Sequence, residues 1–213
     1  MKNVTEVVFI LDRSGSMEGL EKDTIGGFNS LLNQQKQQKG EAVVSAVLFD
    51  DRIEILYDRV PIQEVKQMTR EEYYARGGTA LLDAVGLAIH HIGGVQKKMQ
   101  KEKRPDKTLF VITTDGMENS SRLYTYGKVK EMIEKKQKKH GWEFLFLGAN
   151  IDAVKEAANF GIESSHASNY HADKKGIGNH YEVLSKTITQ YRSCGTIDQK
   201  WKKEIERDNQ KKR

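Results

Sequence analysis

The sequence predicts an α/β fold with a doubly wound, mostly parallel sheet of six strands, one of them antiparallel, and helices on both faces. Two observations carry this prediction. Short runs of β-branched and aromatic residues, such as 107–114, alternate along the chain with longer stretches of helical periodicity, such as 79–98. Strands that alternate with helices form a parallel sheet covered on both faces, and such strands are apolar on both sides, as 142–147 is.

The individual elements follow from the same patterns. Strands are expected over residues 4–12, 42–50, 52–60, 107–114, 142–147 and, as a short element, 165–170. Helices are expected over 20–39, 79–98, 123–139, 152–160 and 179–192, and Gly40 ends the first of them. Asp50-Asp51 is a turn signal, so the second and third strands form an antiparallel hairpin. Residues 61–76 have no clear period, and no element is predicted there.

Length and composition indicate one folded domain. The chain has 213 residues, of which 37% are apolar and 31% charged. We expect a single domain over residues 3–193 and a basic tail, helical or disordered, over 194–213. No run approaches the roughly 20 apolar residues that a membrane-spanning helix needs. The absence of a secretory signal and the single cysteine, Cys194, lead us to expect a cytoplasmic protein.

The formal net charge of +5 is concentrated in two segments. Residues 97–107 carry six Lys or Arg against two acids, and residues 198–213 carry seven against four. Acids are interleaved in both segments and no aromatic stacking set accompanies the lysines, which is typical of a solvated surface. Nucleic acid is therefore not an expected partner. Nucleic-acid binding by the basic tail stays open as an alternative that the salt dependence of binding would decide.

Oxygen-bearing side chains gather where two of the predicted strands end. Residues 4–12 run into Asp12-Arg13-Ser14-Gly15-Ser16, residues 107–114 run into Asp115-Gly116, and Thr79 follows two glycines before a helix. Ligands of open α/β sheets bind beyond the carboxyl ends of the strands. We therefore expect one cation site made of five side chains, namely Asp12, Ser14, Ser16, Thr79 and Asp115.

The residue types of this set define the cation. Two carboxylates and three hydroxyls suit Mg²⁺, with Mn²⁺ or Ca²⁺ as alternatives, rather than Zn²⁺, which prefers nitrogen and sulfur. His166, His171 and His180 lie near Cys194 in the sequence, but their spacing matches no zinc motif, and polar surface histidines are expected. The competing interpretation is that the five are ordinary turn and helix-cap residues.

All three segments together resemble the metal-ion-dependent adhesion site of von Willebrand factor A (integrin I-like) domains. The similarity extends to the flanking residues FILDRSGSM (9–17), GGTALLDA (77–84) and VITTDG (111–116), and it looks closest to stand-alone A domains of bacteria and phages. The resemblance implies that Ser14, Ser16 and Thr79 are direct or near-direct ligands and that Asp12 lies close, often through water. It further implies that Asp115 changes between direct and water-mediated contact.

The resemblance also implies a function. The expected function is binding of an unidentified partner protein, which offers an Asp or Glu to the open coordination position of the divalent cation. Neither catalysis nor a membrane is expected. A metal-assisted hydrolase is the alternative, but the sequence has no phosphate-binding Gly-x-x-x-x-Gly-Lys loop and no His or Lys beside the five residues. Asp83, Glu118 and Asn119 are left open between site and structural roles. Arg13 is expected to point away from the ion, toward solvent or a partner.

Overall fold

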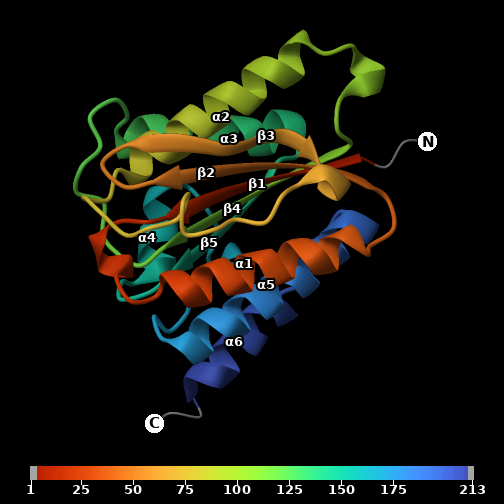
Figure 1. Ribbon diagram of the computed structural model, residues 1–213. Helices are drawn as coiled ribbons and strands as arrows, with labels where there is room; N and C mark the ends of the chain where they lie inside the picture. The colour runs from red at the N-terminus through yellow and green to blue at the C-terminus, as the bar shows by residue number, and fades with distance from the viewer. Residues whose placement is uncertain (1–3, 211–213) are drawn as a thin grey trace.

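The computed structural model describes the chain from Val4 to Gln210, with side chains as far as Glu206. This part of the chain forms a six-stranded sheet in the order β3-β2-β1-β4-β5-β6. Neighbouring strands are parallel except for the antiparallel pair β2 and β3. Figure 1 shows the sheet as the middle layer between two layers of helices. The predicted fold class is confirmed.

The strands lie close to their predicted bounds. They are β1 (Val4–Asp12), β2 (Glu41–Phe49), β3 (Ile53–Pro61), β4 (Lys107–Thr114), β5 (Glu143–Gly148) and β6 (Ala167–Asn169). β1 lies in the middle of the sheet, and its side chains alternate between two cores. Phe9 and Leu11 belong to one core and Val8 and Ile10 to the other, which explains why the strand is apolar throughout.

The helices cover the two faces of the sheet in sets of three. The first set is α1 (Glu21–Lys36), α5 (Lys174–Cys194) and α6 (Lys200–Gln210), and the second is α2 (Leu81–Lys98), α3 (Tyr126–His140) and α4 (Ala153–Asn159). Side chains of each set pack into the core of its own face. Among residues 4–210, no helix has both the length and the apolar character needed to cross a membrane.

α5 is the element whose start differs most from the prediction. It begins at Lys174 rather than near residue 179. The side chain of Asp173 caps it by accepting a hydrogen bond from the backbone N–H of Gly176 at 2.8 Å. Gly176 and Gly178 interrupt the apolar pattern in this first turn, so sequence periodicity alone could not find it.

Part of the expected tail packs against the domain. The helical alternative holds for α6, which lies against α5 and β6. Trp201 and Ile205 of α6 are buried in the core on that face. The indole N–H of Trp201 donates to the carbonyl of Ser165 at 3.1 Å. The strongly polar composition of residues 198–213 concealed these two anchoring side chains; residues 211–213 lie outside the described part.

His180 corrects the expectation that the histidines are polar surface residues. Its side chain in α5 is only 2% exposed. The ring lies 4.4 Å, between centroids, from both Tyr170 and Tyr181. Neither of its ring nitrogens has a hydrogen-bond partner among the described residues. Burial therefore disfavours the charged form and lowers the pKa of His180 to about 3.

This burial predicts a pH-dependent stability. The unfolded state binds a proton at His180 near pH 6.5 and the folded state only near pH 3, so the free energy of unfolding decreases as the pH falls through this window. Between pH 7.5 and pH 5, the free energy of unfolding of wild type should fall by about 1–2 kcal/mol more than that of His180→Phe, which keeps an aromatic ring but cannot titrate. Urea unfolding of both proteins across the window measures the difference. Parallel curves would show that His180 is not the group responsible.

Candidate metal centre

The sheet brings the first and last of the predicted site segments together. β1 and β4 are adjacent and parallel, with Leu11 opposite Thr113, so both strands end at the same edge. Asp12 is the last residue of β1, and Asp115 follows β4 directly. Both carboxylates are buried. This edge lies on the left-hand side of Figure 1, where η1 (Gly15–Met17) follows β1.

Asp12 is held in place by the protein itself. One carboxylate oxygen, Oδ1, accepts a hydrogen bond from the backbone N–H of Ser14 at 2.7 Å. The other, Oδ2, accepts one from the hydroxyl of Thr114 at 2.6 Å. Burial raises the pKa of Asp12, and these hydrogen bonds oppose that effect. Its orientation is therefore fixed without any ligand.

The hydroxyls form a chain that leads to the second carboxylate. Ser14 Oγ and Ser16 Oγ lie 3.0 Å apart, and Ser16 Oγ donates to Asp115 Oδ1 at 2.5 Å. Thr79 borders the same point, because a Cβ placed on Gly116 would lie 3.5 Å from both Ser16 Oγ and Thr79 Oγ1. All five predicted side chains thus meet at one place. Ser16 is exposed, so the group opens to solvent.

Asp115 carries an unsatisfied oxygen. Its Oδ2 is buried and has no hydrogen-bond partner among the described residues. Burial raises the pKa of Asp115 to about 6; the hydrogen bond from Ser16 opposes this shift and the charge of Asp12 adds to it. A buried carboxylate oxygen without a donor is unfavourable unless a cation or another group compensates it.

The residues present fit a hard divalent cation. Two carboxylates and three hydroxyls surround one solvent-accessible point, and oxygen is the donor that Mg²⁺, Mn²⁺ and Ca²⁺ take. The set contains neither nitrogen nor sulfur, which argues against a site designed for zinc. Among the side chains that the structure describes, no three His, Cys, Asp or Glu form a metal-binding group. The mixed site differs in that hydroxyls accompany its two carboxylates.

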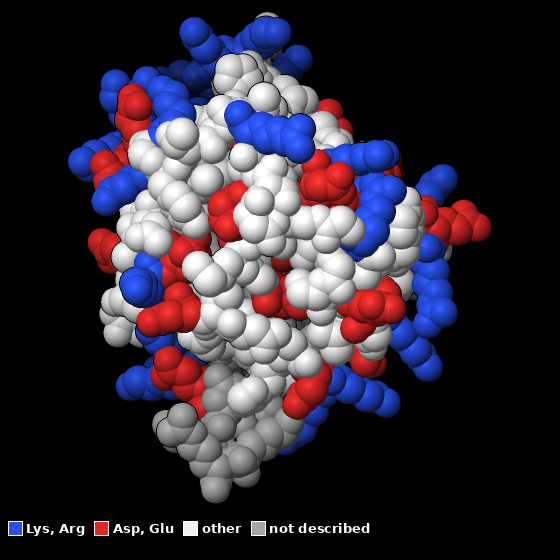
Figure 2. Space-filling model, turned by 90° about the vertical axis from the view of Figure 1, so that its left-hand side faces the viewer, with Lys and Arg blue, Asp and Glu red and all other residues white. Residues whose placement is uncertain are grey.

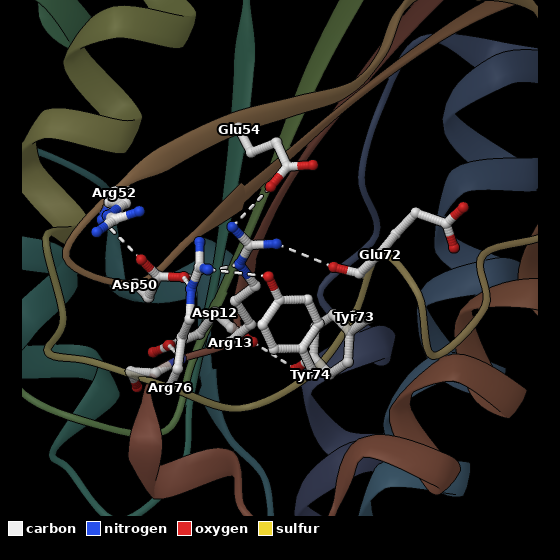
Figure 3. Close-up of polar contacts among 10 residues, drawn as sticks. Asp12, Arg13, Asp50, Arg52, Glu54, Glu72, Tyr73, Tyr74 and Arg76 are labelled. Carbon is white, nitrogen blue, oxygen red and sulfur yellow. Dashed lines mark hydrogen bonds and ion pairs between the residues drawn. The ribbon is translucent and has the colours of Figure 1, made fainter.

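A buried ion-pair network holds the loop that carries Thr79. Figure 3 shows Arg13 pointing into this network. Arg13 Nε donates to Asp50 Oδ2 at 2.8 Å, and Arg76 Nε donates to the same oxygen at 2.8 Å. The other nitrogens of Arg13 donate to Glu54 at 2.8 Å and to the carbonyl of Glu72 at 2.9 Å. Arg13 does point away from the site, but toward the interior: its side chain is fully buried, which corrects the expected solvent or partner contact.

Backbone contacts complete this attachment. The N–H of Arg76 donates to the carbonyl of Arg13 at 2.9 Å, and the N–H of Gly15 donates to the carbonyl of Gly77 at 3.1 Å. Gly77 has φ +65°, a left-handed conformation in which any other residue would be strained, and a Cβ there would also require the Asp51 carboxylate to move. The loop before Thr79 is thus tied to the loop after β1.

Glu118 and Asn119 fix the other side of Thr79. The Asn119 side chain accepts a hydrogen bond from the N–H of Thr79 at 2.8 Å, and Glu118 accepts one from the N–H of Leu82 at 2.9 Å. Asp83 reaches in the opposite direction and accepts from the N–H groups of residues 122–124. These three residues, left open by the sequence, connect the start of α2 to the loop after β4.

Sequence reasoning missed two residues that support Asp12. Thr114 donates to its carboxylate, and the hydroxyl of Tyr73 donates to its backbone carbonyl. Thr114 adjoins Asp115 at the end of a strand, and that position was a usable signal. Tyr73 lies in the segment 61–76, where no pattern predicts a partner 61 residues away.

The chain is an α/β domain with a candidate cation site at one edge of its sheet, and comparison with known proteins identifies the fold. No model of a known protein family matches the sequence, and no curated protein matches it. Solved structures do match. Proximal thread matrix protein 1 from the mussel byssus, solved with a zinc-occupied MIDAS motif, superimposes with a TM-score of 0.59 at 15% identity, over 87% of this chain and 46% of that one.

Two further structures show the same likeness. A von Willebrand factor type A protein from Catenulispora acidiphila gives a TM-score of 0.55 at 14% identity, over 87% of this chain and 42% of that one. The manganese-loaded TRAP protein of Plasmodium vivax gives a TM-score of 0.58 at 17% identity, over 83% of this chain and 71% of that one. The chain therefore has the von Willebrand factor A fold, and it spans less than half the length of the mussel and Catenulispora chains.

The ion-pair network predicts an asymmetric response to mutation. Arg13→Met leaves Asp50 buried with one partner fewer and should lower the free energy of unfolding by about 3–5 kcal/mol. Arg76→Met removes the other ion-pair partner of Asp50, but Arg76 is partly exposed and water can replace it, so a smaller loss is expected. Urea unfolding in EDTA measures both. Equal losses in the two variants would contradict the dominant role of Arg13.

Proposed function

We propose that this protein is a divalent-cation-dependent protein-binding module. The observation that carries the proposal is Asp115 Oδ2, which is buried and unpartnered beside the linked hydroxyls of Ser14 and Ser16. Asp12 and Thr79 complete the set of ligands. The exposed thiol of Cys194 suits a reducing compartment, and a cytoplasmic, bacterial-type protein forms part of the proposal.

Mg²⁺ is the cation we favour, with Mn²⁺ and Ca²⁺ as alternatives. The hard oxygen donors support this choice. The zinc-occupied MIDAS motif of the mussel protein and the manganese of the TRAP protein support a divalent cation in this fold. When bound, such a cation supplies positive charge and a coordination position for an oxygen from outside.

The chain's own hydrogen bonds favour an acidic ligand from a partner. Both oxygens of Asp12 already accept hydrogen bonds, from Ser14 and Thr114, so its charge is partly neutralised by the protein. Three of the five donors are uncharged hydroxyls. The two carboxylates formally balance a divalent cation, but the hydrogen bonds to Asp12 weaken its attraction for the ion. An Asp or Glu of a partner protein is therefore still attracted to the open coordination position.

The rim of the site offers apolar contact to a protein. Met117 and Leu123, on the loop after Asp115, are 68% and 69% exposed, and Tyr74 precedes the Thr79 loop at 41%. Figure 2 shows this face with Asp and Glu scattered over its middle and most Lys and Arg around its edge. Without a cation, this arrangement repels a carboxylate, so partner binding is expected to require the metal.

Asp115→Asn tests the cation site. Without added cation, the variant should be at least as stable as wild type, because a buried, uncompensated charge is removed. At a Mn²⁺ concentration a hundredfold above its Kd, the free energy of unfolding of wild type should rise by about 2.7 kcal/mol, and that of the variant should rise much less. Thermal unfolding with and without Mn²⁺ measures this, with Asp58→Asn on β3 as the control. Equal stabilisation of all three proteins would exclude the site.

A second measurement tests the acidic partner. Water proton relaxivity of the Mn²⁺-loaded protein should fall when a peptide with one Glu between leucines displaces coordinated water. It should stay unchanged when the same peptide carries Gln in place of Glu. Exchanging both Met117 and Leu123 for Ser should weaken binding of the Glu peptide about tenfold but leave the response to acetate unchanged. Equal responses to the Glu and Gln peptides would refute carboxylate capture. Phosphoester turnover that disappears in Asp12→Ala would instead indicate a metal-assisted hydrolase.

A further inference from the structure

Two adjoining basic hollows lie at the end of the molecule opposite the metal site. They are formed by the C-terminal parts of α2 and α3 and by the segment after α2, with volumes of about 280 and 410 Å³. Lys97, Lys136, His140 and Gly93 line both. The fold thus unites two segments that lie far apart in the sequence, the basic run that starts at Lys97 and the run 135–140.

The charge in these hollows is uncompensated. Arg104 lines the first hollow and Lys135 the second, and no Asp or Glu lines either one. Among the side chains described, as far as Glu206, Lys97, Lys135 and Lys136 form no ion pair with a carboxylate. Burial and the neighbouring cations lower the pKa values of Lys136 and His140. Mutual repulsion of this kind marks a place where an anion is stabilising.

The Lys136 side chain packs against the wall of the hollows rather than extending into solvent. Its Nζ lies 4.2 Å from the centre of the Trp142 ring, in a cation–π contact. The Nζ also lies close to the backbone of Gly93 in α2, since a Cβ built on this glycine would lie 2.3 Å from it. Arg104 is also fixed, because it donates to the carbonyls of Met99 and Lys97, each at 3.2 Å.

Helix stabilisation alone does not explain the cluster. Cations in the last turn of a helix interact favourably with its dipole, and this accounts for Lys97 and His140. It does not account for Lys135 or Lys136, which precede the last turn of α3. Each helix C-terminus contributes only about half a negative charge, whereas the hollows carry four Lys and Arg side chains, so a strong positive potential remains.

We propose that these hollows bind the phosphate backbone of a nucleic acid. The sequence did not lead us to expect this partner, but the acids interleaved in residues 97–107 line neither hollow. An extended polyanion can place phosphates in both hollows, and lysines bind phosphate as point charges without reading a base. A protein partner fits less well, because interface cores are depleted in lysine and enriched in aromatic residues. The exposed large apolar side chains of residues 4–210 lie elsewhere, and in the second hollow Ile89 is buried and Met132 half-buried.

Fluorescence anisotropy with labelled DNA and RNA of about 20 nucleotides tests this at several salt concentrations. Lys97 and Lys135, which line the hollows, are exchanged for Gln together with Lys139, whose charge helps to lower the pKa of His140. Lys136 and Arg104 stay in place. The matched control exchanges Lys22, Lys66 and Lys155, which are exposed lysines elsewhere, for the same change in net charge. Asp12→Ala in EDTA serves to separate this binding from the metal site.

The proposal predicts a local effect. The hollow variant should bind about tenfold more weakly near physiological salt, with a salt slope reduced by about two, whereas the control and Asp12→Ala should match wild type. No binding by wild type at low salt would overturn it. So would an equal loss in the control variant, which would show that only net charge matters. Displacement by oligoglutamate as effective as by unlabelled DNA of equal charge would also overturn it, in favour of an acidic protein.

Discussion

The parallel pairing of β1 with β4 is the constraint on which the metal centre depends. It places the end of one buried strand beside the end of the other, so Asp12 and Asp115 lie at one edge without free access to water. The chain supplies hydrogen bonds to three of their four carboxylate oxygens and leaves Asp115 Oδ2 without a donor. The fold therefore retains an unfavourable buried charge at the one point where a cation would relieve it, which is how a binding site differs from a core.

The rigidity of the site comes from the Arg13 network. Burying an ion pair brings little net stability, because desolvation offsets much of the attraction. The Arg13–Asp50 pair instead fixes the geometry of the site. Asp50 follows β2, Arg13 follows β1, and Arg76 belongs to the loop before Thr79. The Asp50 carboxylate therefore connects three segments (Figure 3). Together with Asn119 on the opposite side, it fixes Thr79 before any cation arrives.

The sequence predicted the fold class and the five side chains that meet at the site, because apolar periodicity and three recognisable segments carry that information. The order of the strands was seen only in the structure. The sequence also did not predict which side chains hold those segments in place within the fold. Asp50 looked like a turn residue and Arg13 like a surface residue, yet they pair across 37 positions of sequence. His180 looked polar, and only the packing of α5 buries it. Local pattern identifies elements and donors, whereas the partner of a buried charge is decided by tertiary packing.

The two ends of the sheet are electrostatically independent. α2 begins beside Thr79 and ends at Lys98, and its 18 residues span about 27 Å. This distance is about three times the Debye length of roughly 8 Å at physiological ionic strength, so the charge of a cation at one end hardly affects the basic hollows at the other. Loss of metal therefore leaves the positive potential of the hollows intact. The two ligands proposed above, an acidic protein segment and a polyanion, therefore do not compete for the same charge.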